Sequence, residues 1–470
     1  MQPRLAFYGD DFTGSADVME VLQWAGIPTI LFLAPPTDDQ LQKYGNFEAF
    51  GVAGCSRAMS PKEMETELKP VLQQLRDSGA EIVHYKTCST FDSSPEIGNI
   101  GKAIEIGREL FGPRVVPIVV GAPNLGRYQV FGNLFARSGL DTAPYRLDRH
   151  PTMMHHPITP MHESDLRCHL SQQTRLRIGL YDILRLQSTD SSGCFDGAHT
   201  VDCDALLFDV LFPEHLLEIG SMLDRIAKQK TTSFMVGSSG IEYALTQFWE
   251  SAKGSERMPE SQIARPTFGP VKQLVVITGS CSPVNDRQIA WAEQNDFETL
   301  SLNPARLIDE QTSQSEIELM VQLALERLNR GVNLILHTSR GPNDPRIALA
   351  IESMRAMGLS ELDIRLQSGN LLGPKLGQIL KGILSERRFS RVGVAGGDTS
   401  GYIARELELV ALEAIAPVAP GSPLCRAHAM NSLDGVEIFF KGGQVGKDDV
   451  WGTMLGGTYV GQAASLMPRR

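Results

Sequence analysis

The fold is decided by a pattern first seen in residues 5–25, LAFYGDDFTGSADVMEVLQWA. The apolar run Leu5–Tyr8 is typical of a buried strand, and a Gly/Asp turn then leads into the helical pattern of Gly14–Ala25. Because short apolar runs alternate with helical segments along the whole chain, we expect parallel sheets covered by helices on both faces, an α/β fold. The further strands predicted in this way span residues 29–33, 49–53, 81–84, 115–120, 201–208, 233–236, 273–278, 333–337, 391–394 and 436–440.

The length of 470 residues favours two or three domains. Residues 253–270, KGSERMPESQIARPTFGP, are polar, contain Pro and Gly, and lack apolar periodicity, so we interpret them as a linker. This places an N-terminal domain at 1–252 and a C-terminal domain at 271–470, each with a mainly parallel sheet flanked by helices. A second irregular stretch, 141–165, holds four prolines and four histidines and is predicted to be a long ordered loop.

Composition and charge narrow the class of protein. Apolar residues make up 42% and charged residues 21% of the chain, as in a globular protein with a sizeable core. The net charge of −11 argues against nucleic acid or an anionic membrane as the main partner. Two aspartates at positions 10 and 11 precede any signal-peptide core, and apolar runs such as 115–120 fall short of the ~20 residues that span a bilayer. Seven scattered cysteines without a C-x-x-C pair predict reduced thiols, hence a cytoplasmic protein.

The first candidate site is the turn Tyr8–Ser15, where a strand ends and a helix begins. In open α/β sheets this edge binds ligands. Of the adjacent carboxylates Asp10 and Asp11, one can hydrogen-bond a substrate hydroxyl while the other orients it or holds a cation. Residues 13–15 lie where helix N-terminal N–H groups accept anions. The alternative is that one aspartate only caps the helix.

Two further turns follow strands in the first half. Gly51–Arg57 ends in an arginine that can bind a carboxylate with two hydrogen bonds, although a lone arginine there is more often a surface residue. His84–Ser93 places Lys86 before a run of hydroxyls and a carboxylate, and Gly98–Gly101 follows. This cluster suits a polyhydroxylated anion, with Lys86 supplying charge and Ser, Thr and Asp binding hydroxyls. The alternative is a Ser/Thr-rich loop that satisfies its own backbone.

A fourth turn, Val120–Arg127, is followed by a segment with adjacent histidines, His155–Met161. Neighbouring histidines rarely both reach one ion, and no third ligand occurs at a fitting spacing, so we assign no metal ligands here. Loop packing or substrate contact is the expectation.

Three Gly-rich turns in the second half each follow a predicted strand: Thr278–Pro283, Gly393–Gly401 and Lys441–Gly446. Glycines at such turns let backbone N–H groups approach phosphate closely. Neither the G-x-x-x-x-G-K-[ST] loop nor the G-x-G-x-x-G fingerprint occurs. Three such turns in one half favour phosphate binding.

Taken together, the GDDFTG turn, the Ser56-Arg57 turn, the K-T-C-S-T-F-D-S stretch with G-N-I-G, and the GGDTS and KGG elements resemble the four-carbon acid sugar kinase family (DUF1537 type). The K-T-C-S-T-F-D-S stretch and the later H-P-I-T-P-M segment look like the 3-oxo-tetronate kinase branch. The resemblance implies an N-terminal domain that binds a sugar acid such as 3-oxo-tetronate, threonate, erythronate or 3-oxo-isoapionate. It also implies a C-terminal domain that binds ATP, with chemistry in the cleft between them. The segment between GSCS and GGDTS is longer than usual, and the tail after Lys441 departs from the K-x-G-N-F-G form.

The resemblance also implies roles for individual residues. Asp11 would act as base or orienter of the attacking hydroxyl and Asp10 as its partner or as a ligand of a Mg²⁺-bound water, and the two could be exchanged. Mg²⁺ would bridge phosphate oxygens mainly through water. Substrate contacts would come from Thr13, Arg57, Lys86, Ser89, Thr90 and Asp92. Nucleotide contacts would come from Ser280, Ser282, Gly396, Gly397, Asp398, Thr399, Gly442 and Gly443.

Two other classes stay open at this point. An aldolase- or dehydratase-type enzyme of sugar acids would use Lys86 and the aspartates but leave the Gly-rich turns without a function. A ligand-sensing protein with a degenerate site is the other class. A homodimer is common for enzymes of this kind.

Overall fold

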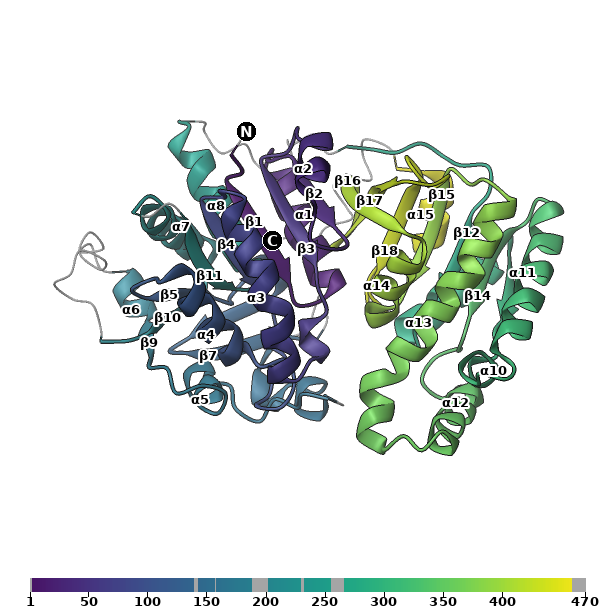
Figure 1. Ribbon diagram of the computed structural model, residues 1–470, viewed down its shortest axis with the longest axis horizontal. Coiled ribbons are helices and arrows are strands. Elements are labelled where there is room, and N and C mark those ends of the chain that lie inside the picture. Colours follow the sequence, from purple (N-terminus) through teal and green to yellow (C-terminus); the bar gives the residue numbers. More distant parts are fainter. Residues whose placement is uncertain are drawn as a thin grey trace. The chain divides into compact units, whose positions relative to one another are not determined.

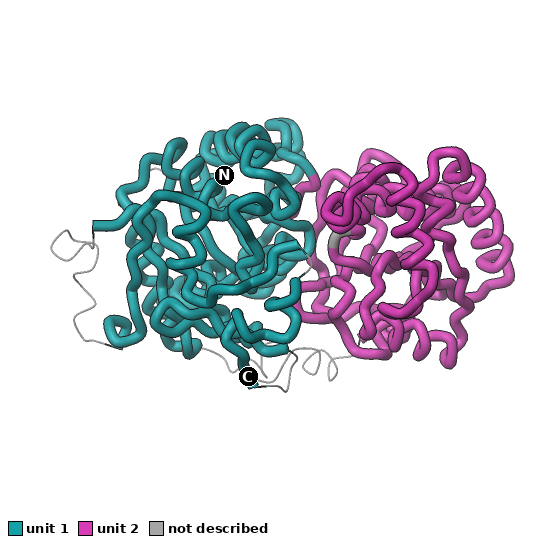
Figure 2. Tube along the Cα trace, turned by 90° about the horizontal axis from the view of Figure 1, so that it is seen from below, with its two compact units in different colours: residues 1–30, 34–262, 470 teal, residues 31–33, 263–469 magenta. Residues whose placement is uncertain are grey.

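The computed structural model describes residues 2–138, 143–156, 158–187, 202–229, 232–254 and 266–458. The chain divides into two compact units, coloured separately in Figure 2. Unit 1 holds Met1–Ile30 and Ala34–Gln262, and unit 2 holds Leu31–Leu33 and Ile263–Arg469. Most of the predicted linker falls on residues 255–265, outside the described residues, so the linker and the domain limits drawn from it stay predictions.

Unit 1 is built on a sheet in the order β2-β3-β1-β4-β11-β5-β10-β9 (Figure 1). Of β2, only Thr29 and Ile30 belong to unit 1, because Leu31 and Phe32 fall in unit 2. The pairs from β3 to β9 are parallel. Each residue of β1 is buried, as expected for a strand covered on both faces. The strands are β1 (Leu5–Gly9), β2 (Thr29–Phe32), β3 (Ala49–Ala53), β4 (Ile82–Lys86), β5 (Val116–Val119), β9 (Ile178–Tyr181), β10 (Ala205–Phe208) and β11 (Ser233–Gly237).

The larger helices of unit 1 pack in two groups, α1 with α7 and α8, and α3 with α4 and α5 (Figure 1). Their starts follow local chemistry: in α3, Pro61 takes the first position and Ser60 and Glu63 form a reciprocal capping box. The helices are α1 (Phe12–Trp24), α2 (Asp38–Lys43), α3 (Pro61–Asp77), α4 (Ile100–Phe111), α5 (Leu166–Ser171), α6 (Ile183–Leu186), α7 (Pro213–Ala227) and α8 (Gly240–Ala252).

A small antiparallel sheet, β6 (Arg127–Val130), β7 (Asn133–Arg137) and β8 (Pro144–Arg146), belongs to unit 1. Phe131 and Gly132 turn the β6–β7 hairpin, both with positive φ (50° and 81°), as a two-residue hairpin turn requires. The stretch 141–165, expected to be a long loop, therefore contains a strand at Pro144–Arg146. It continues in short 3₁₀ turns at Leu147–Arg149 and Met153–His155, where it is described.

Unit 2 has the sheet order β13-β14-β12-β15-β18-β17-β16. The first five strands are parallel to one another, and β17 pairs antiparallel with both β18 and β16. Helices α11, α13 and α14 pack together, and α9 packs with α15. The strands are β12 (Val275–Thr278), β13 (Phe297–Ser301), β14 (Asn333–His337), β15 (Arg391–Ala395), β16 (Leu409–Ala419), β17 (Ser422–Ala429) and β18 (Glu437–Lys441). The helices are α9 (Pro283–Glu293), α10 (Pro304–Ile308), α11 (Ser313–Asn329), α12 (Pro345–Ala356), α13 (Glu361–Glu386), α14 (Gly397–Glu406) and α15 (Val450–Gly456).

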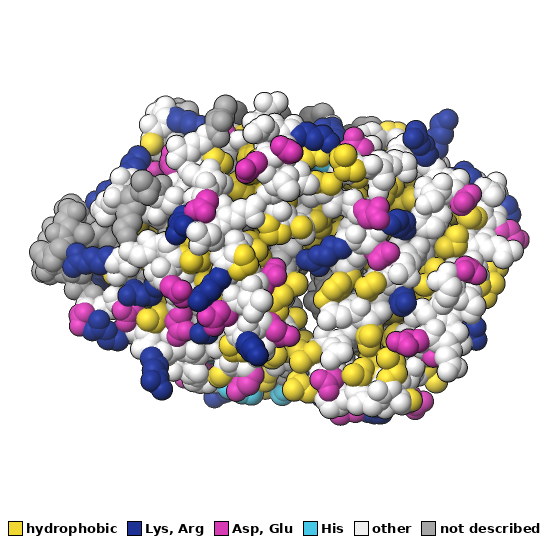
Figure 3. Space-filling view, viewed as in Figure 1, with side chains coloured by type: hydrophobic (Ala, Val, Ile, Leu, Met, Phe, Trp, Pro, Cys, Tyr) yellow, Lys and Arg dark blue, Asp and Glu magenta, His cyan; other side chains and the backbone are white. Residues whose placement is uncertain are grey.

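The predicted α/β class with mainly parallel sheets is confirmed. Acidic and basic side chains are interspersed on the face seen in Figure 3. No helix in the described part of the chain combines the length and apolarity needed to cross a bilayer.

Candidate active site

The register of unit 1 brings the predicted turns of the first half to one edge of its sheet. Gly9 at the end of β1 pairs with Ala53 of β3 and with Lys86 of β4. The Asp10 N–H donates to the Lys86 carbonyl at 2.9 Å, and the Arg57 N–H donates to the Asp10 carbonyl at 3.1 Å. Asp10, Asp11, Arg57 and Lys86 therefore form one cluster, held by backbone hydrogen bonds.

Arg57 is shared by the two aspartates. Its Nη2 donates to Asp10 Oδ1 at 2.9 Å and its Nε to Asp10 Oδ2 at 3.3 Å, while Nη1 lies 3.0 Å from Asp11 Oδ2. Because the three guanidinium nitrogens face carboxylates of the protein, Arg57 fixes the acidic pair in this structure. Its predicted role as the substrate-carboxylate ligand stays a prediction.

Asp11 is both a helix cap and the more accessible carboxylate. Its Oδ1 accepts the Gly14 N–H at the start of α1, and its Oδ2 accepts the Thr13 hydroxyl, both at 2.8 Å. The Asp11 side chain is 20% exposed, against 3% for Asp10. The capping alternative therefore describes Asp11 correctly without excluding chemistry. Thr13, predicted to bind substrate, uses its hydroxyl to orient Asp11.

The two carboxyl groups differ in acidity. Burial, only partly offset by Arg57, raises the pKa of Asp10. Burial also acts on Asp11, but Arg57, Lys86 and the bonds from Thr13 and Gly14 outweigh it and lower the pKa. Asp11 is thus the ionised, reachable acceptor of the pair.

Lys86 reaches this cluster because Gly14 has no side chain. A Cβ at Gly14 would lie 2.4 Å from Asp11 Oδ1 and 2.9 Å from Lys86 Nζ. Lys86 is buried, and its Nζ lies 3.9 Å from Asp17 Oδ2 on α1. The glycine of the GDDFTG turn therefore makes room for the lysine beside the helix N-terminus.

The hydroxyl-rich loop after β4 brings Asp92 near Arg57. Phe91 is buried with φ of 58°, an unusual conformation for a bulky residue and typical of a strained functional loop. Asp92 is 6% exposed; its Oδ2 lies 4.0 Å from Arg57 Nη1, and its Oδ1 has no hydrogen-bond partner among the described residues. Thr90 contacts the Cys88 sulfur at 3.0 Å, and Ser89 is half-buried. Burial, with Asp92 nearby, raises the pKa of Cys88 to about 11.

The G-N-I-G segment after this loop has a structural explanation. A Cβ at Gly98 would lie 2.7 Å from the Arg57 carbonyl oxygen, and Asn99 caps α4. The segment therefore packs under the Arg57 turn instead of contributing side chains to the edge.

In unit 2, the three predicted Gly-rich turns lie together. Thr278 of β12 pairs with Ala395 of β15, which pairs with Lys441 of β18, so all three strands end at the same level. The Ser282 hydroxyl caps α9 and donates to the Gly443 carbonyl. Ser282 N–H donates to Ser280 Oγ at 3.2 Å, and Gly396 N–H donates to the Lys441 carbonyl at 2.9 Å.

Glycine is required at two positions of these turns because serine and threonine side chains approach the backbone closely. A Cβ at Gly443 would lie 2.2 Å from Ser280 Oγ, and one at Gly396, where φ is 143°, would lie 2.1 Å from Thr399 Oγ1. Thr399 Oγ1 is buried and makes no hydrogen bond within the described residues. Gly397 is exposed at the start of α14. A free hydroxyl and backbone N–H groups at a helix N-terminus fit phosphate.

For two predicted nucleotide contacts, Gly442 and Asp398, the structure gives less information. A Cβ at Gly442 would meet only Val445, at 3.3 Å, and the Asp398 side chain is outside the described part of the structure.

Some residues at these edges were not predicted. Lys441 is fully buried, its Nζ donates to the Gly442 carbonyl, and burial lowers its pKa to about 7. Ser339, after β14, donates to the Ser280 carbonyl at 3.2 Å. Only the Lys441 position carried a sequence signal, as the first residue of the KGG element.

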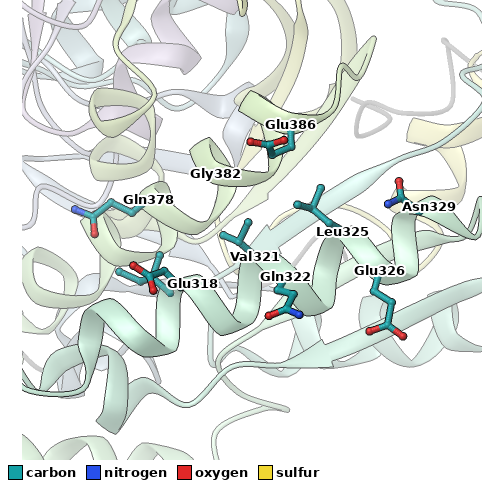
Figure 4. Close-up of a pocket in the computed structure, with 10 residues that line it drawn as sticks. Glu318, Val321, Gln322, Leu325, Glu326, Asn329, Gln378, Gly382 and Glu386 are labelled. Carbon is teal, nitrogen blue, oxygen red and sulfur yellow. The ribbon is translucent and has the colours of Figure 1, made fainter.

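A groove between α11 and α13 lies apart from these residues (Figure 4). Val321 and Leu325 of α11 and Gly382 of α13 line it, with Glu318, Glu326 and Glu386 among its acidic residues. None of the predicted site residues lines it. Within the described ranges, no three His, Cys, Asp or Glu side chains are grouped so as to hold a metal ion.

Comparison with known proteins defines the class. Residues 5–245 match the model of a sugar-binding N-terminal domain, and residues 275–451 match that of a nucleotide-binding C-terminal domain. The chain belongs to the four-carbon acid sugar kinase family, which confirms the expectation from its motifs.

Among its relatives are two named enzymes. The chain is 42% identical to the 3-oxo-isoapionate kinase of Paraburkholderia graminis, over 97% of this chain and 95% of the relative. It is 29% identical to the 3-oxo-tetronate kinase of Methylobacterium radiotolerans, over 97% and 99%.

Two solved structures share the fold. A Salmonella typhimurium LT2 protein described as a tRNA synthase matches with a TM-score of 0.74 at 23% identity, over 95% of this chain and 97% of that one. A Haemophilus influenzae protein of the DUF1537 family matches with a TM-score of 0.66 at 21% identity, over 95% and 98%.

Proposed function

We propose that this sugar-acid kinase transfers the γ-phosphoryl group of ATP to a hydroxyl of a 3-oxo sugar acid, with 3-oxo-isoapionate as the first candidate and 3-oxo-tetronate as the second. The order follows the identities of 42% and 29% to the relatives with those names. The observation that carries the proposal is the pair of sheet edges. The edge of unit 1 is acidic and rich in hydroxyl side chains, and the edge of unit 2 is lined by glycines and holds a Thr399 hydroxyl without a partner among the described residues.

In unit 1, Asp11 orients the attacking hydroxyl. Phosphoryl transfer passes through a loose transition state, so the proton leaves the hydroxyl late and little basicity is needed. The ionised Asp11 accepts this proton as the new O–P bond forms and the bond to the leaving diphosphate oxygen breaks. Asp10 acts through Arg57, which it holds with two hydrogen bonds. Lys86, Ser89, Thr90 and Asp92 bind the rest of the sugar acid.

In unit 2, the phosphate groups are held by backbone N–H groups at the start of α14 and by Ser280, Ser282, Thr399, Gly442 and Gly443. ATP supplies the phosphoryl group, and Mg²⁺ bound with it would neutralise charge on the phosphate oxygens. Transfer occurs only when the acceptor hydroxyl and the γ-phosphoryl group are brought into line.

Coupled ADP release tests the proposal, with the two 3-oxo acids, threonate and erythronate as acceptors. The expected result is ADP release that depends on the acid and is fastest with 3-oxo-isoapionate. ADP release that does not respond to any of these acids would refute the sugar-acid assignment.

An aldolase- or dehydratase-type reaction predicts a different outcome. Such an enzyme would convert the sugar acid without ATP and gain no thermal stability from ATP, because only a ligand of the folded state raises Tm.

A further inference from the structure

The cations predicted to bind the substrate carboxylate are already compensated within unit 1. Arg57 contacts Asp10 and Asp11 directly and lies 4.0 Å from Asp92, and Lys86 lies 3.9 Å from Asp17. Four carboxylates thus face two cations. An anionic sugar acid brought to this edge requires a further positive charge that is not engaged by a protein carboxylate.

Arg127, the first residue of β6, supplies that charge. Its Nη1 donates to the carbonyls of Leu125 at 2.9 Å and Arg137 at 3.4 Å, whereas Nε and Nη2 make no hydrogen bond among the described residues. Nε is also buried from solvent. An unpartnered buried guanidinium nitrogen is costly, which favours an anionic ligand along the Nε–Nη2 edge.

Arg127 faces the substrate-binding loop. Cys88, Asp92 and Asp17 lie within electrostatic range of its guanidinium. Asp92 Oδ1 and Asn124 Oδ1 are further buried acceptors without partners among the described residues. A guanidinium edge without a partner, together with acceptor oxygens that also lack partners among the described residues, is the combination that a hydroxylated carboxylic acid needs.

The fold fixes β6 at the correct edge of the sheet. Arg127 and Ala122, which follows β5, exchange backbone hydrogen bonds of 3.0 and 3.1 Å, and Gln129 and Val210, which follows β10, exchange bonds of 2.7 and 3.0 Å. The buried Asp209 carboxylate accepts the N–H groups of the hairpin turn, Phe131 at 2.6 Å and Gly132 at 2.9 Å. β5 and β10 continue the parallel order from β4, so Arg127 shares the edge with Lys86.

We infer that Arg127 binds the carboxylate of the sugar acid through its Nε–Nη2 edge, with Asp92 Oδ1 accepting a neighbouring hydroxyl. This inference deepens the proposed function and rests on it for the substrate class. Arg127 is then the specificity-determining residue for the acid group, and Arg57 is a positioning residue for the aspartates.

The test compares 3-oxo-isoapionate with its uncharged carboxamide for wild type, Arg127→Met and Arg127→Lys. Two charge-assisted hydrogen bonds predict a KM for the acid raised by roughly 10- to 100-fold in Arg127→Met, with kcat and the KM for ATP nearly unchanged. The carboxamide should bind wild type and variant about equally. Arg127→Lys keeps the charge but loses the paired hydrogen bonds of the guanidinium, so the KM for the acid should rise by an intermediate factor. Arg137→Met, an exposed arginine on the same hairpin, is the matched control and should leave each KM unchanged.

Calorimetric binding of the acid without ATP separates this inference from the proposed function. If wild type binds the acid but does not transfer phosphate, the kinase proposal fails. The calorimetric affinities of wild type and the Arg127 variants for the acid and the carboxamide then still test the inference. Equal losses for acid and carboxamide in both variants would assign Arg127 a purely structural role and overturn the inference. A wild type that binds no sugar acid would overturn both. Unfolding midpoints check that each variant is folded.

Discussion

Gly396→Ala perturbs the nucleotide edge at its most restricted position. Gly396 has φ of 143° and ψ of 132°, a region that is essentially restricted to glycine and costs other residues about 1–3 kcal/mol. The added Cβ would lie 2.1 Å from Thr399 Oγ1 and 3.5 Å from Thr399 Cβ, so the first turn of α14 must shift. We expect the free energy of unfolding to fall by about 2 kcal/mol or more. The KM for ATP should also rise, because we propose that the same turn binds phosphate.

Urea unfolding and the Tm shift produced by ATP measure the two effects. Gly396→Ala combined with Thr399→Ala removes the oxygen contact but keeps the unfavourable φ, so it should recover part of the stability. Gly456→Ala at the end of α15 is the control, because its methyl group meets no heavy atom within 4 Å. If Gly396→Ala unfolds within about 0.5 kcal/mol of wild type and responds normally to ATP, the reasoning about this turn is wrong.

Three further predictions concern single side chains. Asp11→Asn keeps the cap on α1 but removes the charge, so kcat should fall by roughly 10²- to 10⁴-fold while the ATP-induced Tm shift is retained; unchanged turnover would remove Asp11 from the chemistry. Burial lowers the pKa of Lys441 from 10.5 to about 7, so the folded protein binds fewer protons than the unfolded one between these values, and stability rises with pH across that window. Urea unfolding at several pH values should show this slope, up to about 1.4 kcal/mol per pH unit, and Lys441→Met should abolish it; an equal slope in the variant would contradict the assignment. Since burial raises the pKa of Cys88 to about 11, its alkylation by iodoacetamide, followed by peptide mass spectrometry, should be slow at pH 8 and accelerate toward pH 11, whereas fast labelling at pH 7 would contradict that pKa.

The sequence predicted most of the parallel strands because each is a continuous apolar run, but it missed the parallel strands β9 and β13 at the ends of the two sheets. β9 contains Gly179, and β13 contains Glu298 and Thr299, so neither is such a run. Asn333–His337 and Ala49–Ala53 were predicted with the bounds that the structure shows. The antiparallel elements were missed: β16 contains Glu413 and Pro417, and the β6–β7 hairpin turns at Phe131-Gly132, which is not a typical hairpin dipeptide.

In the candidate site, too, the features that follow from local sequence patterns could be predicted, and those that depend on distant contacts could not. The turns that carry Asp10, Asp11 and Lys86 could be found because they follow predicted strands, and parallel strands end at a common edge. That Arg57 is held by the aspartates, and that Arg127 has an unpartnered Nε, depends on contacts between residues 46 to 78 positions apart, or on their absence, which no local pattern encodes.

The central claim, phosphoryl transfer from ATP to a sugar acid, is tested most directly with ATP labelled in the γ-phosphoryl group. Incubation with 3-oxo-isoapionate should move the label into a phosphate ester of the acid, in a one-to-one ratio with the ADP formed. Label recovered as inorganic phosphate, or retained in ATP while the acid is converted, would contradict the account.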